Sequence, residues 1–373
     1  MNTLRILGIR GIPAAHGGFE TFAEKLALYL CERGWKVIVY CQEDGEGPAW
    51  DDEWRGIQRV HIPVTQRGAL GTILFDWKST MHAARQKHTC LTLGYNTAVF
   101  TAVLRAKGIP NVINMDGIEW SRAKWGPMAK AWFWLNERAG CWLGTKLIAD
   151  HPEIKRHLSS GFRGDPTRIE MIPYGADDQK YVDQTADSLI LKDFGLWKNG
   201  YMTVIARPEP ENSLLEIVKA FSMRERRCKL VVLGNYDASN HYHQRVIDSA
   251  GGAVIFLGAI YDQGVVSCLR RNCLAYIHGH QVGGTNPSLV EALGAGNPIV
   301  AHANRFNAWV TQDAALYFEN EVILDEQMTK LIDSSELREN LGTAGRKRFL
   351  ADLTWPSVLQ RYESLLLEYA QEG

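Results

Sequence analysis

Residues 278–296 read HGHQVGGTNPSLVEALGAG and follow a short apolar run that is typical of a buried strand. Asn286 suits the N-cap of a helix, and Pro287 suits its first position. Gly283 and Gly284 leave room for backbone amides to face a ligand. Free amides and the helix dipole favour an anion at such a point, so the stretch predicts a diphosphate-binding loop at a helix N-terminus.

Glu291 lies four residues beyond Pro287, about one turn into the same helix and on the same face. Its carboxylate would repel phosphates but could accept hydrogen bonds from ribose hydroxyls. A well-capped buried helix with an incidental Glu is the alternative. A diphosphate at the helix tip and a ribose beside Glu291 together fit a nucleotide sugar. The residues predicted to bind it in this half of the chain are Gly283, Gly284, Thr285, Asn286 and Glu291.

Outward from this stretch, short apolar runs alternate with helical segments along the whole chain, which predicts an α/β fold with parallel sheets. We expect two Rossmann-like parallel-sheet domains that face a cleft, followed by C-terminal helices. The expected domains are 1–180, 181–350 and a C-terminal helix, 351–373, that returns to the first domain. Ligands of open α/β sheets bind beyond the carboxyl ends of the strands.

The first predicted strand leads into RGIPAAHGGFE, residues 10–20. Gly17 and Gly18 would open a helix whose free amides and dipole favour an anion. The spacing of the glycines is not that of a dinucleotide-binding GxGxxG motif, which disfavours a nicotinamide oxidoreductase. A tight turn with no ligand is the alternative.

Three further residues at predicted strand ends are candidates for the reaction itself. Asp116 and Glu119 form a carboxylate pair that could orient sugar hydroxyls or act as a base, although a turn or capping role also fits Asp116. Arg207 could donate a forked pair of hydrogen bonds to a diphosphate, and an interdomain ion pair is its alternative.

Composition limits the remaining possibilities. The net charge of −1 over 373 residues argues against a nucleic-acid partner, and the seven scattered Cys fit a reducing compartment rather than a disulfide framework. Neither a signal peptide nor an 18-residue apolar run is found, so we expect a cytoplasmic protein. No paired acidic DxD motif follows a strand, and we therefore expect no metal and no cofactor.

Segment 120–142 is rich in Trp and basic residues, which is typical of a surface that contacts a membrane. Contact with the inner face of the cell membrane is therefore a hypothesis. The alternative is an ordinary core helix. Helical spacing predicts that one stripe of this segment is core; its members are Met128, Ala131, Leu135, Ala139 and Trp142.

At these motifs the chain resembles the retaining glycosyltransferases of family four, which have the GT-B fold, and more closely their bacterial rhamnosyltransferase-like branch. The matching stretches are 10–27, 114–125 and 278–307. The resemblance implies that a sugar passes from a nucleotide donor to a glycan or lipid-linked acceptor with retention of configuration. It also implies that Gly17 and Gly18 approach the donor phosphates and that Glu291 holds the ribose. Domain 1–180 would then be the acceptor-side domain, and domain 181–350 would bind the nucleotide-sugar donor.

Two positions depart from the broad family. That family has two Glu separated by seven residues, of which the first contacts the donor sugar and the second binds the ribose. Here the second is Glu291, and Gly283 takes the place of the first. Asn212 stands where the family usually has a Lys near the phosphates, which leaves Arg207 with more of that charge. The first departure fits the rhamnosyl-type branch.

The resulting hypothesis is a retaining glycosyltransferase that uses dTDP-rhamnose and a lipid-diphosphate-linked glycan or saccharide acceptor in bacterial surface-glycan synthesis. A UDP-hexose-dependent transferase of the same fold is the nearest alternative, and a sugar-nucleotide epimerase is a more distant one. A two-lobe sugar-binding protein would be expected to carry an export signal and would not explain a diphosphate-binding loop.

Overall fold

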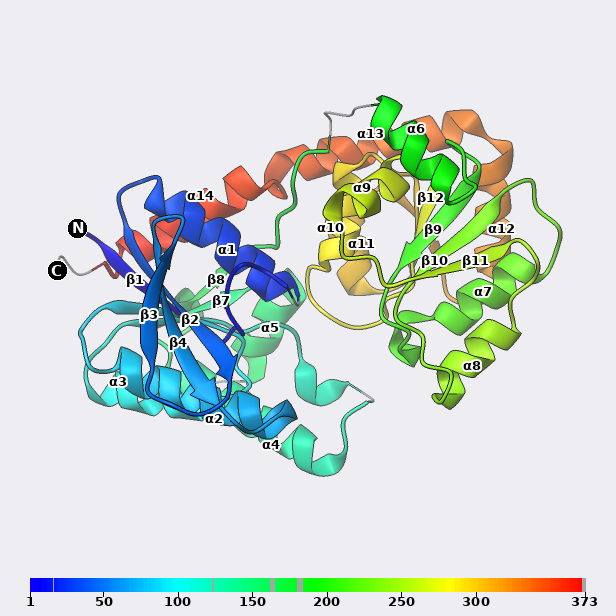
Figure 1. The fold of residues 1–373 in the computed structure, drawn as a ribbon. Coiled ribbons are helices and arrows are strands. Elements are labelled where there is room, and N and C mark those ends of the chain that lie inside the picture. The colour runs from blue at the N-terminus through cyan, green and yellow to red at the C-terminus, as the bar shows by residue number, and fades with distance from the viewer. Residues whose placement is uncertain (16, 123, 162–164, 180–183, 371–373) are drawn as a thin grey trace. The chain divides into compact units, whose positions relative to one another are not determined.

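The computed structural model describes residues 1–15, 17–122, 124–161, 165–179 and 184–370. They divide into two compact units (Figure 1). The first unit comprises Met1–Tyr174 and Trp355–Gly373, and the second comprises Gly175–Thr354. The predicted boundary between residues 180 and 181 lies outside the described residues.

The first unit is built on an eight-stranded sheet with the order β3-β4-β2-β1-β5-β6-β7-β8. Every neighbouring pair is parallel except β3 and β4. Its strands are β1 (Thr3–Leu7), β2 (Lys36–Asp44), β3 (Trp50–Trp54), β4 (Ile57–Val64), β5 (Thr89–Leu93), β6 (Asn111–Asn114), β7 (Lys146–Ala149) and β8 (Ile169–Met171).

Helices cover both faces of this sheet. One apolar core joins it to α1 and α14, and another joins it to α2 and α3. Strands covered on both faces in this way are buried along their whole length, as β1 and β5 are. Arg5 of β1 is accommodated by hydrogen bonds to Tyr40 and Gln86. The helices are α1 (Gly18–Cys31), α2 (Gly68–Ala83), α3 (Ala102–Ala106), α4 (Pro127–Leu143), α5 (Pro152–Gly161) and α14 (Trp355–Leu367), with 3₁₀ turns η1 (Ala98–Thr101), η2 (Glu119–Ser121) and η3 (Pro166–Arg168).

The second unit has a six-stranded parallel sheet with the order β11-β10-β9-β12-β13-β14. Its strands are β9 (Tyr201–Ile205), β10 (Lys229–Leu233), β11 (Val254–Gly258), β12 (Ala275–His278), β13 (Ile299–His302) and β14 (Ala315–Phe318). Two apolar cores lie on opposite faces, one with α9 and α10 and the other with α7 and α12.

The remaining bounds of the second unit complete the path of the chain. Its helices are α6 (Gln184–Asp193), α7 (Leu214–Ser222), α8 (His241–Asp248), α9 (Gln263–Arg271), α10 (Pro287–Gly294), α11 (Arg305–Thr311), α12 (Glu321–Asp333) and α13 (Ser335–Asp352), with one 3₁₀ turn, η4 (Pro210–Asn212). Among the described helices, none has the length and apolarity needed to cross a bilayer.

The predicted core stripe of α4 is wrong. Met128 is 88% exposed, Leu135 49% and Trp142 69%. The buried side of the helix instead carries Asn136 and Glu137, whose polar atoms all find partners. Buried polar groups are tolerated when they are hydrogen-bonded, and here that contribution outweighs the apolar periodicity of the sequence.

Glu137 shows how these polar groups are accommodated. Its carboxylate accepts hydrogen bonds from Trp120 Nε1 at 2.8 Å and His157 Nε2 at 3.1 Å, and it pairs with Arg138 at 2.9 Å. The buried side of α4 is therefore held in part by a polar network, and Met128, Trp134, Leu135 and Trp142 are left exposed.

Candidate functional site

The carboxyl edge of the second sheet has a switch point between β9 and β12. These strands are neighbours, but the chain proceeds from β9 to β10 on one side and from β12 to β13 on the other. Loops 206–213 and 279–286 therefore leave adjacent strand ends in opposite directions. Such a divergence forms the crevice in which open α/β sheets bind ligands.

The two loops are fastened to each other. Ser213 Oγ donates to the carbonyl of Gly279 at 2.8 Å, and Gln281 N donates to the carbonyl of Glu211 at 2.9 Å. A Cβ atom on Gly279 would lie 2.1 Å from the carbonyl oxygen of Asn212, so only glycine fits there. This close approach fixes the loop that carries Arg207 against the loop that leads into α10.

The start of α10 has the predicted caps. Asn286 is the N-cap, its side chain accepts a hydrogen bond from Ser288 N at 3.0 Å, and Pro287 is the first helical residue. Gly283 has φ of +133°, and no heavy atom lies within 4 Å of the place of its missing Cβ. Gly283 and Gly284 are partly exposed, whereas Thr285 is buried. The helix tip is therefore accessible rather than covered by packed side chains.

Glu291 lies one turn further along α10 and is paired with a residue that the sequence analysis did not select. Arg270 Nη2, at the end of α9, lies 2.7 Å from Glu291 Oε2. The Arg270 side chain is 2% exposed and that of Glu291 is 30% exposed. Glu291 thus combines a buried cationic partner with an accessible surface.

Arg207 lies in the loop after β9, as predicted, and its side chain is exposed. The carbonyl oxygen of Arg207 accepts a hydrogen bond from Asn212 Nδ2 at 2.8 Å. Asn212 is therefore a structural residue that shapes the loop. The exposed guanidinium of Arg207 is a cation at this edge of the sheet.

Two histidines occur at the same edge without having been predicted as site residues. The rings of His278 and His280 are stacked with centroids 4.4 Å apart. Burial, with nearby imidazoles as a smaller cause, lowers the pKa of His278 well below its usual value, so this ring is neutral. The alternation His278-Gly279-His280 at a strand end was the available signal.

In the first unit, the switch point lies between β1 and β5. A Cβ on Gly8 would lie 2.3 Å from the carbonyl oxygen of Leu93, so the two strand ends approach closely. The loop after β1 leads to Gly17, the N-cap of α1, whose extended φ of 175° any residue could adopt. The carboxylate of Glu20 would lie 3.1 Å from a Cβ on Gly17, so an acidic group already stands beside this helix tip.

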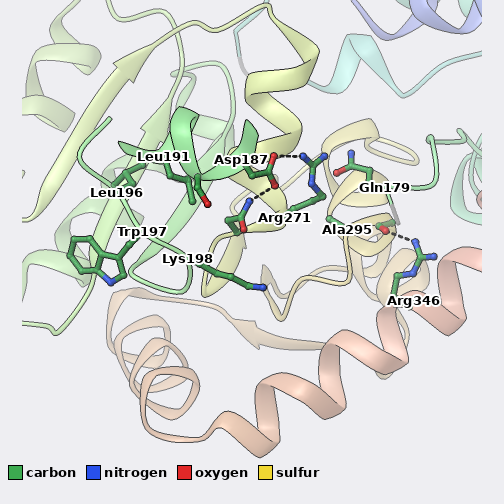
Figure 2. A pocket seen from close by; sticks show the side chains of 12 residues that line it. Gln179, Asp187, Leu191, Leu196, Trp197, Lys198, Arg271, Ala295 and Arg346 are labelled. Atoms are coloured by element: carbon green, nitrogen blue, oxygen red, sulfur yellow. Dashed lines mark hydrogen bonds and ion pairs between the residues drawn. The ribbon is translucent and has the colours of Figure 1, made fainter. Parts of the chain in front are cut away.

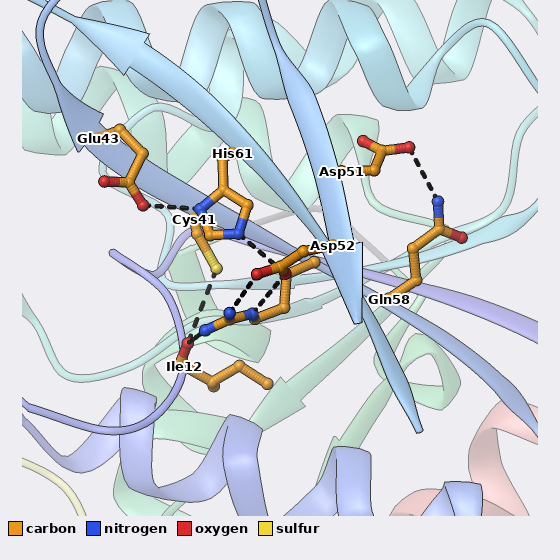
Figure 3. Close-up of polar contacts among 8 residues, drawn as sticks. Ile12, Cys41, Glu43, Asp51, Asp52, Gln58 and His61 are labelled. Atoms are coloured by element: carbon orange, nitrogen blue, oxygen red, sulfur yellow. Dashed lines mark hydrogen bonds and ion pairs between the residues drawn. The ribbon is translucent and has the colours of Figure 1, made fainter. Parts of the chain in front are cut away.

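A pocket of about 630 Å³ opens at the carboxyl ends of β1, β2 and β4 in this unit. Its wall contains His61, whose ring nitrogens contact Glu43 Oε1 at 2.6 Å and Asp52 Oδ1 at 3.0 Å (Figure 3). Arg59 donates to Asp52 and to the carbonyl oxygen of Ile12. Hydrogen bonding from Arg59 holds the pKa of Asp52 at about 2. This network anchors the loop after β1 to the neighbouring strands.

Asp116 and Glu119 follow β6 in the first unit. Asp116 has φ of +51°, a conformation that is uncommon for a non-glycine residue and is often found at functional sites. Glu119 is engaged with its own loop, because its carboxylate pairs with Arg122 at 2.7 Å and accepts from Trp125 Nε1 at 3.0 Å. Glu119 is therefore held within its own loop, and Asp116 is distinguished by its backbone conformation.

Another pocket, of about 510 Å³, lies in the second unit before the amino ends of β9 and β12, at the opposite edge of the sheet from the α10 tip. Figure 2 shows Arg271 paired with Asp187, at 2.7 Å, among its lining residues. Lys198 and Arg346 add further cations to the lining. Its position at the amino edge makes it a poorer donor site than the crevice at β9 and β12.

Comparisons with known proteins give different results for the two units. Residues 1–177 match a family described as a domain of unknown function, DUF1972. Residues 196–348 match the family "Glycosyl transferases group 1". No curated protein matches the sequence.

Several solved structures are similar over almost the full chain. Sucrose-phosphate synthase from Thermosynechococcus elongatus has a TM-score of 0.81 at 15% identity, with 99% of each chain covered. HepE of Anabaena in complex with UDP-glucose has a TM-score of 0.78 at 14% identity, with 99% of this chain and 100% of that chain covered. WaaG, a glycosyltransferase involved in lipopolysaccharide biosynthesis, has a TM-score of 0.75 at 16% identity, covering 97% and 99%. At these identities the similarity shows the fold.

Proposed function

We propose that this glycosyltransferase, whose residues 196–348 match the group 1 glycosyl transferases and whose fold is GT-B, transfers rhamnose from dTDP-rhamnose to a lipid-linked or polysaccharide acceptor. The observation that carries the proposal is the accessible start of α10 at the β9/β12 switch point. Glycine amides, the helix dipole and the exposed Arg207 all favour a diphosphate at this edge.

Each donor-binding residue has a separate role in this proposal. Backbone amides of Gly283 and Gly284, together with the turn at Thr285 and Asn286, receive the diphosphate. Glu291 accepts hydrogen bonds from the sugar of the nucleoside. Arg207 donates to the phosphate oxygens, where negative charge develops as the glycosidic bond breaks, and such preorganised donors are usually the largest electrostatic contribution to catalysis.

The transfer is proposed to retain the anomeric configuration and to need no enzyme nucleophile. The acceptor hydroxyl attacks C1 of the sugar on the face that the diphosphate leaves. The leaving phosphate oxygen takes the proton of that hydroxyl, so the products are the glycoside and the nucleoside diphosphate. This route forms no covalent bond between the sugar and a side chain of the donor site.

Acceptor binding is assigned to the first unit. The left-handed backbone of Asp116 at the end of β6 supports a role in orienting an acceptor hydroxyl. Gly17 and Gly18 are proposed to approach the donor phosphates, and Glu20, beside Gly17, limits how much further negative charge that helix tip can take. Glu119 is proposed to shape the loop through its contacts with Arg122 and Trp125.

The function is tested by incubating the protein with dTDP-rhamnose, UDP-glucose and related nucleotide sugars and with a lipid-diphosphate-linked acceptor, followed by mass spectrometry. A mass gain of one deoxyhexose on the acceptor supports the proposal. A mass gain of one hexose favours the UDP-hexose alternative, and an epimerised donor without transfer favours an epimerase. The anomeric configuration of the product, determined by NMR, tests retention.

We also propose that the first unit binds the inner face of the cell membrane through α4. Met128, Trp134, Leu135 and Trp142 are exposed on this helix, and Arg138 lies 3.9 Å from the Trp134 ring centre. Interfacial helices expose Trp and apolar residues beside basic ones in this way. The cytoplasmic side fits a nucleotide-sugar donor.

Sedimentation with anionic vesicles tests the membrane contact. Replacing Trp134 and Trp142 by Ala should strongly reduce the bound fraction. Trp197→Ala is the matched control, because Trp197 is a comparably exposed tryptophan, 54%, in the second unit. Equal binding of the wild type and both variants would contradict membrane contact through α4.

A further inference from the structure

Arg270 is a buried cation whose charge is balanced by Glu291. The Arg270 side chain is 2% exposed, and its ion pair with Glu291 measures 2.7 Å. A buried charge is strongly unfavourable unless it is paired, so this contact holds both side chains in place. The arginine Nε has no hydrogen-bond partner among the described residues, so the ion pair is its principal polar contact.

Two other titratable groups beside Arg270, Tyr276 and Cys273, do not neutralise its positive charge. Burial raises the pKa of Tyr276 to about 12 and that of Cys273 to about 12, although Arg270 lowers both somewhat. Both groups are therefore neutral near pH 7. Glu291 remains as the anion that neutralises the guanidinium.

The same carboxylate is the one assigned to the ribose. With 30% of its side chain accessible, Glu291 can receive a ligand while Oε2 remains bound to Arg270. A free glutamate would lose side-chain freedom on binding a nucleotide, and this entropic loss opposes binding. A glutamate that is already held in one place loses less, which is the usual basis of preorganised affinity.

We propose that Arg270 is a positioning residue that fixes and orients Glu291 for the hydroxyls of the donor's ribose or deoxyribose. This inference rests on the proposed donor site. Arg270 itself does not contact the donor. It acts through one hydrogen-bonded carboxylate, so its removal should affect only those ligands that offer hydroxyls to Glu291.

The test compares nucleotides with and without these hydroxyls. dTDP and UDP, and their 2′,3′-dideoxy counterparts, are titrated calorimetrically into the full-length wild type and the variants Arg270→Gln, Arg270→Lys and Glu291→Gln. Arg270→Gln should raise the Kd of the tighter-binding natural nucleotide by about ten- to a hundredfold, the range expected for a lost charge-assisted hydrogen bond. The Kd of the dideoxy nucleotide should stay within about twofold of the wild type.

The chain offers a matched control next to Arg270. Arg271 lies on the same helix and makes an ion pair of the same length, 2.7 Å, but with Asp187 in the pocket of Figure 2. Arg271→Gln removes a comparable pair and should leave the Kd of all four nucleotides unchanged. Arg270→Lys keeps the charge but not the forked geometry, so it should fold and show an intermediate loss, again only for natural nucleotides.

These titrations distinguish a failure of the role of Arg270 from a failure of the proposed donor site. Equal weakening of natural and dideoxy nucleotides in Arg270→Gln or Arg270→Lys would mean a general structural role and would overturn the inference. A normal Kd in both Arg270 variants, with weak binding in Glu291→Gln, would overturn the inference and leave the donor site intact. A normal Kd in Glu291→Gln, or no nucleotide binding by the wild type, would refute the proposed site itself. A double variant with both Arg270→Gln and Glu291→Gln should bind the natural nucleotide no more weakly than Glu291→Gln alone, because Arg270 acts only through Glu291.

Discussion

Replacing Asp76 by Asn should stabilise the protein at neutral pH. Asp76 lies on α2 with 8% exposure, and its carboxylate accepts a hydrogen bond from Thr97 Oγ1 at 2.8 Å. Burial raises the pKa of Asp76 to about 6 from 3.8, although Thr97 opposes this shift. The native state therefore holds a proton that the unfolded chain has already released between pH 4 and 6.

The sign and size of the effect follow from this difference. Because the native state binds more protons in this window, the free energy of unfolding falls as the pH rises from about 4 to 6. A shift of about two pH units corresponds to about 3 kcal/mol at pH 7. The amide introduced by Asp76→Asn cannot ionise and can still accept from Thr97, so this substitution should recover up to that amount.

Urea denaturation monitored by tryptophan fluorescence at pH 4.5 and 7.5 measures the effect. The variant should gain about 1 kcal/mol at pH 4.5 and about 3 kcal/mol at pH 7.5. Asp44→Asn, an exposed aspartate in the same unit, is the control and should change the free energy of unfolding by less than about 0.5 kcal/mol at either pH. An equal gain for Asp76→Asn at both pH values would refute the reasoning.

Three other substitutions have distinct expected outcomes. Glu137→Ala leaves the partly buried Arg138 and His157 without their carboxylate, and it should lower the free energy of unfolding by about 3–5 kcal/mol in urea. A loss below about 1 kcal/mol would count against the network. Asp52→Asn should lose less stability than the wild type as the pH falls from 4 to 2, measured by circular dichroism. Arg59 lowers the pKa of Asp52, and the stabilisation that this pair supplies is lost as Asp52 takes up a proton. Unchanged acid sensitivity would show that the pair is unimportant. Gly283→Ala should cost about 1–3 kcal/mol of stability through its φ of +133° and weaken nucleotide binding, and wild-type values for both would argue against the loop's role.

The α/β class and its two successive parallel sheets were predictable because strands buried on both faces leave continuous apolar runs in the sequence. The GT-B fold was expected from the resemblance of the motifs and not from these runs. Two strands were not predicted. β3 reads WDDEW and is mostly exposed, and it exists because Arg55 and Gly56, both with positive φ, form a tight hairpin that pairs it antiparallel with β4. β14 is a four-residue strand at the edge of the second sheet, directly after α11.

The candidate site was predictable to the extent that it depends on local backbone chemistry. The cap at Asn286 and the helix start at Pro287 are confirmed, since both follow from neighbouring residues. Arg270 could not be found in this way, because its contact with Glu291 joins two helices that are brought together only by tertiary packing. The core stripe of α4 was predicted wrongly for a similar reason, since Trp120 and His157, which contact the buried Glu137, lie 17 and 20 residues away in the sequence.

A crystal structure of the protein with dTDP bound tests the central claim most directly. The account predicts that the diphosphate lies on the backbone amides of residues 283–286, with the deoxyribose hydroxyl at Glu291 and the Arg270 contact preserved. A nucleotide bound instead in the pocket around Lys198 and Arg271, or a diphosphate placed away from the start of α10, would contradict it.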